Sequence, residues 1–296
     1  MAKIEKVLFI GLGVMGEPMC RNLVKKSGLN VVGFDRNMEP LERLTSFGVV
    51  QAPDLAVALT NVDALLLSLP NGAEVEDLSL MDNGLLSRVH AGQTVIDLGT
   101  TPVELTRNLA TRFAAKGVAY ADAPVSRTRS AAEAGTLSVL VGSNKQVFDS
   151  ILPLLDCFAE EVTHCGDVGT GQIFKQLNNM VLAQTVLALA EALSVGRLAG
   201  LDDKLLFETL SKCSADSFAL RNHGMKALLP GKFPKRAFST AYMLKDIGYA
   251  LALAEDNGLK LPAASLTKKL LQETVEAGYA DEYFPSLIKV LNFQTY

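Results

Sequence analysis

The segment KVLFIGLGVMGEPMCRNL, residues 6 to 23, joins a short apolar run to a helical pattern through three glycines. This order predicts a strand, a tight turn and the start of a helix. Gly11 would allow a sharp bend, Gly13 would leave room for a pyrophosphate, and Gly16 would let the helix approach the strand. Unpaired amides at the helix start would face the phosphates. The segment predicts a dinucleotide site, although such glycine motifs also occur as purely structural turns.

The residues after the second predicted strand, over 30–34, indicate which cofactor is used. Asp35 follows this strand, about 20 residues beyond the glycine motif, where a carboxylate accepts hydrogen bonds from the adenosine ribose. A carboxylate also repels the additional phosphate of NADP, whereas Arg36, next in sequence, could attract it. The pair favours NAD and leaves NADP open.

Strand and helix patterns alternate through the first half of the chain, and only helix patterns follow Gly171. We expect further strands over residues 62–69, 94–98 and 139–142 and helices over 40–47 and 148–158. Later helices are expected over residues 172–199, 202–211, 242–256, 263–277 and 284–291. The chain should therefore be an α/β protein with a Rossmann-type, doubly wound parallel sheet over residues 1–164 and an all-helical second domain over residues 165–296.

Two loops follow predicted strands at the edge where doubly wound sheets bind ligands. These loops are expected to lie along the cofactor, although each could be a turn that only ends its strand. They are Leu69-Pro70-Asn71 and Gly99-Thr100-Thr101. The sequence Thr101-Pro102-Val103-Glu104 also predicts the start of a helix, with Thr101 as its N-cap.

A polar loop with two arginines follows the strand pattern that ends near Asp122. Arg127 and Arg129 flank Thr128, and Ser126 stands just before them. Hydroxyl groups, guanidinium groups and loop amides together suit a small anion such as a carboxylate, sulfonate or phosphate. A solvated surface loop would have the same composition.

The longest predicted helix opens with Lys175 and Asn179 on one face, a turn apart. If a cleft between the domains desolvated the Lys175 amine, its neutral form would be favoured and it could exchange a proton near neutral pH. The spacing alone favours a lysine that extends to solvent. Lys245-Asp246 could likewise be a surface pair or direct the lysine into the cleft.

Composition excludes several classes of function. The chain has 296 residues, 49% of them hydrophobic, and a net charge of −4, which offers no basic surface for nucleic acid or anionic membranes. Asn178, Asn179, Gln184 and Glu191 interrupt the one apolar run long enough to suggest a membrane span. The four cysteines lack C-x-x-C spacing and only three histidines are present, so we expect free thiols, no metal and a cytoplasmic location.

These motifs, taken in order, resemble the β-hydroxyacid dehydrogenase family, which includes 3-hydroxyisobutyrate dehydrogenase, tartronate semialdehyde reductase and sulfolactaldehyde reductase. The resemblance covers nearly the whole chain. Its cofactor signature is similar to the segment from Gly11 through Met19, and its substrate signature to residues 122–137. Its catalytic signature resembles the run from Gly169 through Lys175 to Asn179.

The resemblance implies an NAD(P)-dependent oxidoreductase acting on a small anionic β-hydroxy acid or its semialdehyde. The apolar helix that begins at Gln172 indicates self-association, and we expect a homodimer or homotetramer. Lys175 would be the general acid/base and Asn179 would orient the substrate. Substrate binding would involve Ser126, Arg127, Thr128 and Lys245. Cofactor binding would involve Gly11, Leu12, Gly13, Val14, Met15, Gly16, Asp35, Arg36, Leu69, Pro70, Asn71, Thr100 and Lys245.

The chain departs from the family pattern after Ser126. Many members have two glycines where this chain has Arg127-Thr128, and a similar Arg-Thr pair occurs in sulfolactaldehyde reductases. The Arg-Thr pair therefore leaves open a substrate that carries a second anionic group. An imine reductase of the same architecture, which typically lacks the lysine, and a non-catalytic dinucleotide-binding protein are the competing functions.

Overall fold

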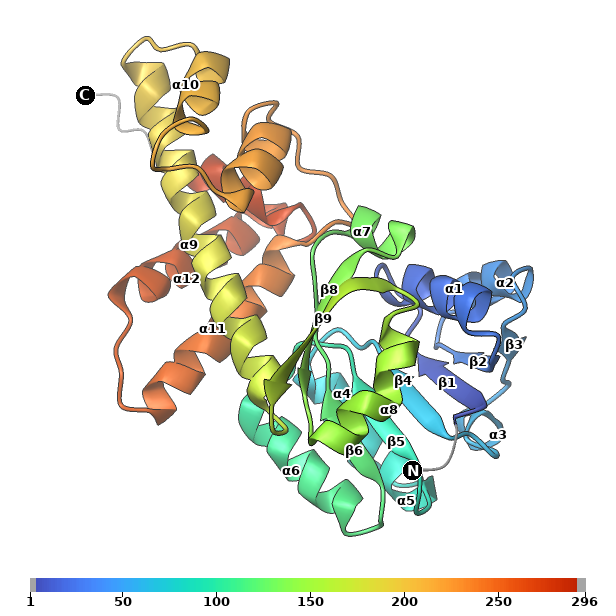
Figure 1. Cartoon of the computed structure of the whole chain (residues 1–296). Coiled ribbons are helices and arrows are strands. Elements are labelled where there is room, and N and C mark those ends of the chain that lie inside the picture. The colour runs from blue at the N-terminus through green and yellow to red at the C-terminus, as the bar shows by residue number, and fades with distance from the viewer. Residues whose placement is uncertain (1–3, 292–296) are drawn as a thin grey trace. The chain divides into compact units, whose positions relative to one another are not determined.

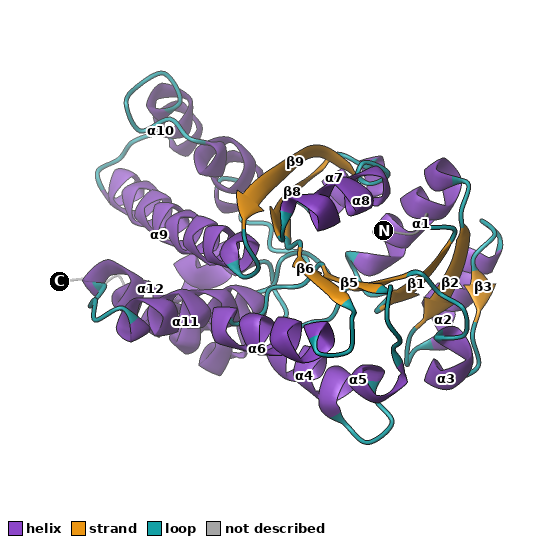
Figure 2. Cartoon of the chain, turned by 60° about the horizontal axis from the view of Figure 1, so that its bottom comes forward, coloured by secondary structure: helices purple, strands orange, loops and turns teal. Residues whose placement is uncertain are grey.

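The computed structural model describes residues 4–291 of a chain that divides into two compact units, Met1–Lys175 and Gln176–Tyr296. The first unit holds a mostly parallel sheet between helices, and the second unit is helical (Figures 1 and 2). This arrangement confirms the predicted α/β class with a Rossmann-type sheet and a helical second part. The predicted domain boundary between residues 164 and 165 stays a prediction.

The sheet of the first unit has nine strands in the order β3-β2-β1-β4-β5-β6-β8-β7, with β9 also paired to β8. The strands are β1 (Lys6–Ile10), β2 (Asn30–Phe34), β3 (Val50–Gln51), β4 (Ala64–Leu67), β5 (Thr94–Asp97), β6 (Ala119–Asp122), β7 (Val125–Ser126), β8 (Leu137–Gly142) and β9 (Ala159–Gly166). The pairs among β1 to β6 are parallel. Strand β8 runs antiparallel to β6 and β7, which departs from the all-parallel sheet expected.

The helices of the first unit are α1 (Gly16–Ser27), α2 (Met38–Thr45), α3 (Leu55–Ala58), α4 (Gly72–Leu80), α5 (Leu85–Arg88), α6 (Val103–Ala114), α7 (Arg129–Ala134) and α8 (Lys145–Leu155). Side chains of α1, α2 and α8 pack on one face of the sheet, and side chains of α3 to α6 pack on the other. Both faces are therefore covered, as parallel sheets require.

The central strands explain why the apolar runs in the sequence are continuous. Val7 and Phe9 of β1 belong to one core cluster, while Leu8 and Ile10 belong to the cluster on the opposite face. Successive side chains of a strand point to opposite faces, so a strand covered on both sides needs apolar residues at every position. Each such fully buried side chain contributes roughly 1.5–3 kcal/mol.

The second unit is built around the continuation of one long helix, α9 (Thr170–Leu198), which begins in the first unit. Its other helices are α10 (Asp203–Leu210), the π-helix η1 (Leu220–Leu228), α11 (Thr240–Asp256), α12 (Pro262–Thr274), the π-helix η2 (Val275–Tyr279) and the 3-10 helix η3 (Phe284–Val290). Within residues 4–291, α9 alone is long and apolar enough to cross a membrane. The core helix of a globular protein passes the same test of length and composition.

Three local features differ from the sequence prediction. Strand β9 lies where no strand was expected, because its polar and partly exposed side chains give no strand signal. Thr101 does not cap α6, since the N-cap is Pro102. The Thr101 hydroxyl instead donates a hydrogen bond to Asp97. The π-helix η1 lies where no helix was predicted.

The buried carboxylate of Asp122 joins the end of β6 to the first turn of α9. Its Oδ1 accepts a hydrogen bond from the Gly169 amide at 2.7 Å, and its Oδ2 accepts one from the Gln172 amide at 2.8 Å. A Cβ at Gly142 would lie 2.5 Å from Oδ1 and one at Gly171 would lie 2.9 Å from Oδ2. The two glycines therefore leave the space that the carboxylate fills, and an acid at a helix N-terminus also suits the helix dipole.

The ionisation of Asp122 should make stability depend on pH. Burial raises its pKa from 3.8 to about 6, against the lowering effect of the two amide hydrogen bonds. Because the pKa is higher in the folded state, protonation of Asp122 stabilises the fold. This contribution to the unfolding free energy is fully present below the pKa of the unfolded state and is lost as pH rises through about 6. We predict that the unfolding free energy of Asp122→Asn minus that of the wild type increases by up to about 3 kcal/mol from about pH 4 to about pH 7.

Urea unfolding at a series of pH values measures this difference. The loss of one hydrogen-bond acceptor in Asp122→Asn shifts the difference by the same amount at every pH, so the change with pH reports the ionisation. Asp82→Asn, at an exposed position of the same unit, serves as the control and should show a constant difference from the wild type. Parallel curves for wild type and Asp122→Asn would contradict the assignment.

Candidate functional site

The glycine turn between β1 and α1 has the geometry of a phosphate cradle. Gly11 has φ +88°, and a Cβ there would lie 2.3 Å from the Ser68 carbonyl oxygen. A Cβ at Gly16 would lie 1.9 Å from the Gly11 carbonyl oxygen, so the helix and the turn are in direct backbone contact. By contrast, a Cβ at Gly13 would meet no atom within 4 Å. Two glycines thus close the turn, and the third keeps it open toward the amides at the start of α1, which fits a pyrophosphate.

Asp35 connects the end of β2 to this turn. Its Oδ2 accepts a hydrogen bond from the Leu12 amide at 2.5 Å, and its Oδ1 accepts one from the Asn37 amide at 2.7 Å. Each carboxylate oxygen has further acceptor capacity, so the group can also receive ribose hydroxyls. Arg36 lies at the surface, where its guanidinium is 3.3 Å from the Glu74 carboxylate.

A second polar network fixes the loop after β5, which contains Thr100. Asp97 accepts hydrogen bonds from the Thr101 hydroxyl at 2.7 Å and from the Gly99 amide at 2.9 Å. Gln172 in α9 reaches the same loop, since its Oε1 accepts from the Thr101 amide and its Nε2 donates to the Gly99 carbonyl, at 3.0 and 2.9 Å. The loop and the first turn of α9 are therefore held together by buried side chains.

Sequence reasoning missed Asp97 and Gln172. Asp97 could have been noticed as an acidic residue at the carboxyl end of an apolar strand, the same position that drew attention to Asp35. Gln172 lies three residues before Lys175, on the same side of the helix, but an uncharged amide at that spacing carries no specific signal.

Lys175 is directed inward, and its partner is a residue predicted to bind substrate. The side chain belongs to a residue only 9% exposed, and its Nζ donates a hydrogen bond to the Ser126 hydroxyl at 3.4 Å. The expectation from spacing alone, a lysine extended to solvent, is wrong. Ser126 lies on β7, so the strand places a hydroxyl beside an amine that the first turns of α9 supply.

Arg127 and Thr128 are held in the loop after β7. Arg127 has φ +84°, and its guanidinium donates to the Thr136 carbonyl at 2.7 Å and pairs with the Glu160 carboxylate at 2.5 Å. The Thr128 hydroxyl shares a hydrogen bond with Ser130. Ion pairs between such exposed groups contribute only about 0–1 kcal/mol, so an incoming anion can compete with Glu160 for Arg127.

In the second unit, Asn179 and Lys245 both contact one buried carboxylate. The Asn179 amide nitrogen donates to Asp246 Oδ2 at 2.6 Å, and Lys245 Nζ lies 3.1 Å from Asp246 Oδ1. The ammonium of Lys245 also lies 5.4 Å from the ring centre of Tyr242 and 5.3 Å from that of Tyr249. Because Asp246 is 2% exposed, Lys245-Asp246 is not the exposed surface pair that the sequence left open.

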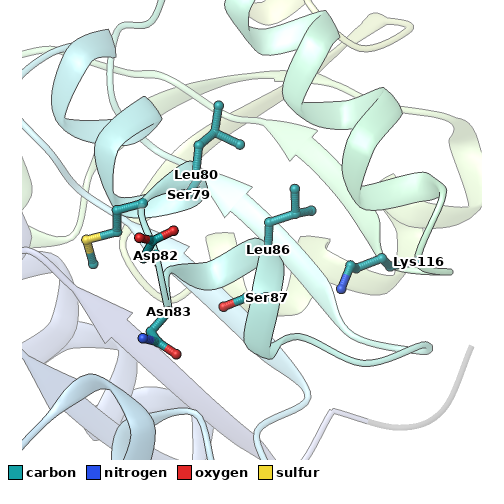
Figure 3. Close-up of a pocket in the computed structure, with 8 residues that line it drawn as sticks. Ser79, Leu80, Asp82, Asn83, Leu86, Ser87 and Lys116 are labelled. Atoms are coloured by element: carbon teal, nitrogen blue, oxygen red, sulfur yellow. The ribbon is translucent and has the colours of Figure 1, made fainter.

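One further pocket lies at the ends of α4 and α5 (Figure 3). It is lined by Ser79, Leu80, Met81, Asp82, Asn83, Leu86, Ser87 and Lys116. Helix α4 starts after the carboxyl end of β4, so its last residues lie at the opposite edge of the sheet from the glycine turn. None of the predicted site residues lines this pocket, and over residues 4–291 no cluster of three acidic, histidine or cysteine side chains could hold a metal.

Comparison with known proteins gives matches over both parts of the chain. Residues 6–166 match the family model described as the NAD binding domain of 6-phosphogluconate dehydrogenase. Residues 169–291 match the model described as NAD-binding of NADP-dependent 3-hydroxyisobutyrate dehydrogenase.

Two relatives and one solved structure illustrate the relationship. The chain is 33% identical to 2-(hydroxymethyl)glutarate dehydrogenase of Eubacterium barkeri, over 98% of this chain and 96% of that protein. It is 35% identical to 3-hydroxyisobutyrate dehydrogenase of Pseudomonas aeruginosa, over 92% of each. A solved structure of Mycobacterium tuberculosis 3-hydroxyisobutyrate dehydrogenase with L-serine matches 98% of this chain and 100% of that chain, with 29% identity and a TM-score of 0.88. The chain therefore belongs to the β-hydroxyacid dehydrogenase family of NAD(P)-dependent oxidoreductases.

Proposed function

We propose that this family member transfers a hydride between NAD(P) and a small β-hydroxy acid or its semialdehyde, with Lys175 as the group that exchanges the proton. The observation that carries the proposal is the buried Lys175 amine beside the Ser126 hydroxyl. A solvent-facing lysine would serve no such reaction. The first turn of α9, held by Asp122 and Gln172, fixes where this amine lies.

The chemistry requires a hydride acceptor and a proton acceptor. The nicotinamide ring, when bound, supplies the first of these. The neutral Lys175 amine accepts the proton of the substrate hydroxyl during oxidation and returns it during reduction. Ser126 and the following loop amides would hold the carboxylate, and Asn179, one helical turn beyond Lys175, would hold the hydroxyl or carboxylate.

The names of the two relatives indicate the substrate class. Both 3-hydroxyisobutyrate and 2-(hydroxymethyl)glutarate carry a hydroxymethyl group on the carbon that bears a carboxylate, and the glutarate has a second carboxylate. A carboxylate contact near Ser126 and a proton acceptor at Lys175 suit this common part. Arg127, held by a weak exposed ion pair, could receive a second anionic group.

For the cofactor we favour NAD within the family's NAD(P) range. Support comes from the Asp35 carboxylate, which contacts the glycine turn through the Leu12 amide and which we propose as the acceptor for the ribose hydroxyls, and from Glu74, which balances the charge of Arg36. Both features disfavour the additional phosphate of NADP. The two competing functions are less well supported, because imine reductases typically lack the lysine and a non-catalytic binding protein would need neither Lys175 nor Asn179.

We also propose that the protein acts as a homodimer or homotetramer in the cytoplasm. Phe174, Leu177 and Val181 form an exposed apolar row along α9, at 54, 42 and 59% exposure. Such a row on a long helix suits contact with a second copy of the chain. The free thiols of all four cysteines fit a reducing compartment.

Replacing the lysine tests the proposed chemistry. We predict that Lys175→Ala lowers kcat by about 10²–10⁴-fold while the NADH dissociation constant changes by less than about twofold. Steady-state absorbance at the reduced nicotinamide band measures kcat, and NADH fluorescence measures binding. Lys145→Ala, at an exposed helical position, should behave as the wild type. Unchanged turnover in Lys175→Ala would refute the catalytic role, and activity of the wild type on cyclic imines alone would support an imine reductase.

Variants of the ion pair between Arg127 and Glu160 test whether Arg127 binds a second anionic group of the substrate. We predict that Arg127→Ala weakens binding of 2-(hydroxymethyl)glutarate by about tenfold, and of 3-hydroxyisobutyrate by less than about threefold. Glu160→Gln, which frees the guanidinium, should strengthen binding of the glutarate. The constants can be measured with these acids as substrates or as competitive inhibitors. Arg129→Ala removes a charge two residues away, at the start of α7, where Arg129 pairs with Glu133, and is the matched control. Equal losses for both acids would count against this role of Arg127.

A further inference from the structure

Among the described residues of the second unit, Asp246 is a deeply buried charged group that contacts the predicted site residue Asn179. It lies on α11 and is 2% exposed, and its Oδ2 accepts the amide hydrogen bond of Asn179 at 2.6 Å. Asn179, on α9, is itself 1% exposed. A hydrogen bond between a carboxylate and a buried amide is short and strong, because the acceptor is charged and water is excluded.

This contact fixes which way the Asn179 amide points. Asn178 Nδ2 donates to the Asn179 oxygen at 3.0 Å, so the oxygen receives a donor and the nitrogen faces an acceptor. Turning the amide over would place its oxygen against the Asp246 carboxylate, and two acceptors at 2.6 Å repel each other. A side-chain amide has two N–H groups, and Asp246 uses one of them. The other can donate to an oxygen of a bound molecule.

The second carboxylate oxygen faces Lys245. Its distance from the ammonium is 3.1 Å, yet it accepts no well-directed hydrogen bond from any residue in the described range 4–291, although it is buried. The charge of Asp246 therefore holds Lys245 by attraction rather than by a directed bond. One carboxylate thus acts on two side chains that are both proposed to contact substrate or cofactor.

We propose that Asp246 is a positioning residue that holds Asn179 as a hydrogen-bond donor toward the substrate. The inference rests on the proposed function, because it requires Asn179 to contact the substrate. Asp246 itself touches no reacting atom in this account. Its effect on the reaction passes through the orientation of the Asn179 amide, while its contact with Lys245 is a second and separable one.

A double-mutant cycle separates positioning from a general structural role. Asp246→Asn removes the charge and lets the amide turn over, so we expect kcat/KM for 3-hydroxyisobutyrate to fall by about 10- to 100-fold. In an Asn179→Ala background the same change should lower kcat/KM by a clearly smaller factor than in the wild type, because the amide that Asp246 orients is absent and only its contact with Lys245 is lost. Asp246→Glu, which keeps the charge, should retain more activity than Asp246→Asn.

Controls keep the outcome interpretable. Asp256→Asn, at the exposed end of α11, should match the wild type, and thermal unfolding shows whether all variants are folded at the assay temperature. Independent effects of the two substitutions, multiplying in the double variant, would overturn the positioning role. A wild type inactive on every hydroxy acid and semialdehyde would instead refute the proposed function.

Discussion

The hydrogen bonds of one buried carboxylate, Asp122, determine where the long helix α9 begins relative to the sheet. The carboxylate accepts hydrogen bonds from the Gly169 and Gln172 amides, and Lys175 follows Gln172 within one turn of the helix. Asp122, at the end of β6, thus supplies acceptors for two amides at the start of α9 that have no partner within the helix. The side chains of the first two turns of α9 are therefore held in fixed positions relative to the sheet. Proton transfer over hydrogen-bond distance requires such fixed positions.

The same arrangement recurs at other strands of the first unit. Asp35 after β2, Asp97 at the end of β5 and Asp122 at the end of β6 each accept backbone amides from neighbouring loops or from α9. Parallel strands end at one edge of the sheet, so these acids anchor the loops on the side where such sheets bind ligands. Gln172 adds a side-chain amide that pairs with the Thr101 amide and the Gly99 carbonyl of the loop after β5. Side-chain hydrogen bonds therefore fix the loops at this edge of the sheet.

The sequence predicts the parts that depend on local pattern. Strands β1, β4 and β5 appear as continuous apolar runs because both faces are covered, and Gly11 and Gly16 mark backbone positions that no other residue fits. The polar edge strand β9 and the reversed direction of β8 were missed, since both depend on pairing between distant segments. Lys175 and Asn179 were identified from motif and spacing. The contacts of Asn179 with Asp246 and of Arg127 with Glu160 were not predicted, because the two residues of each pair lie 67 and 33 positions apart in the sequence.

The central claim is that the Lys175 amine exchanges a proton with the substrate, and chemical rescue measures this most directly. Turnover of Lys175→Ala is followed while methylamine or ethylamine is added at fixed pH and ionic strength, with an uncharged alcohol of the same size as the control. The account predicts that turnover rises with the concentration of free amine and that the alcohol has no effect. An enzyme that binds NADH and substrate normally, yet gains no turnover from either amine, would contradict it.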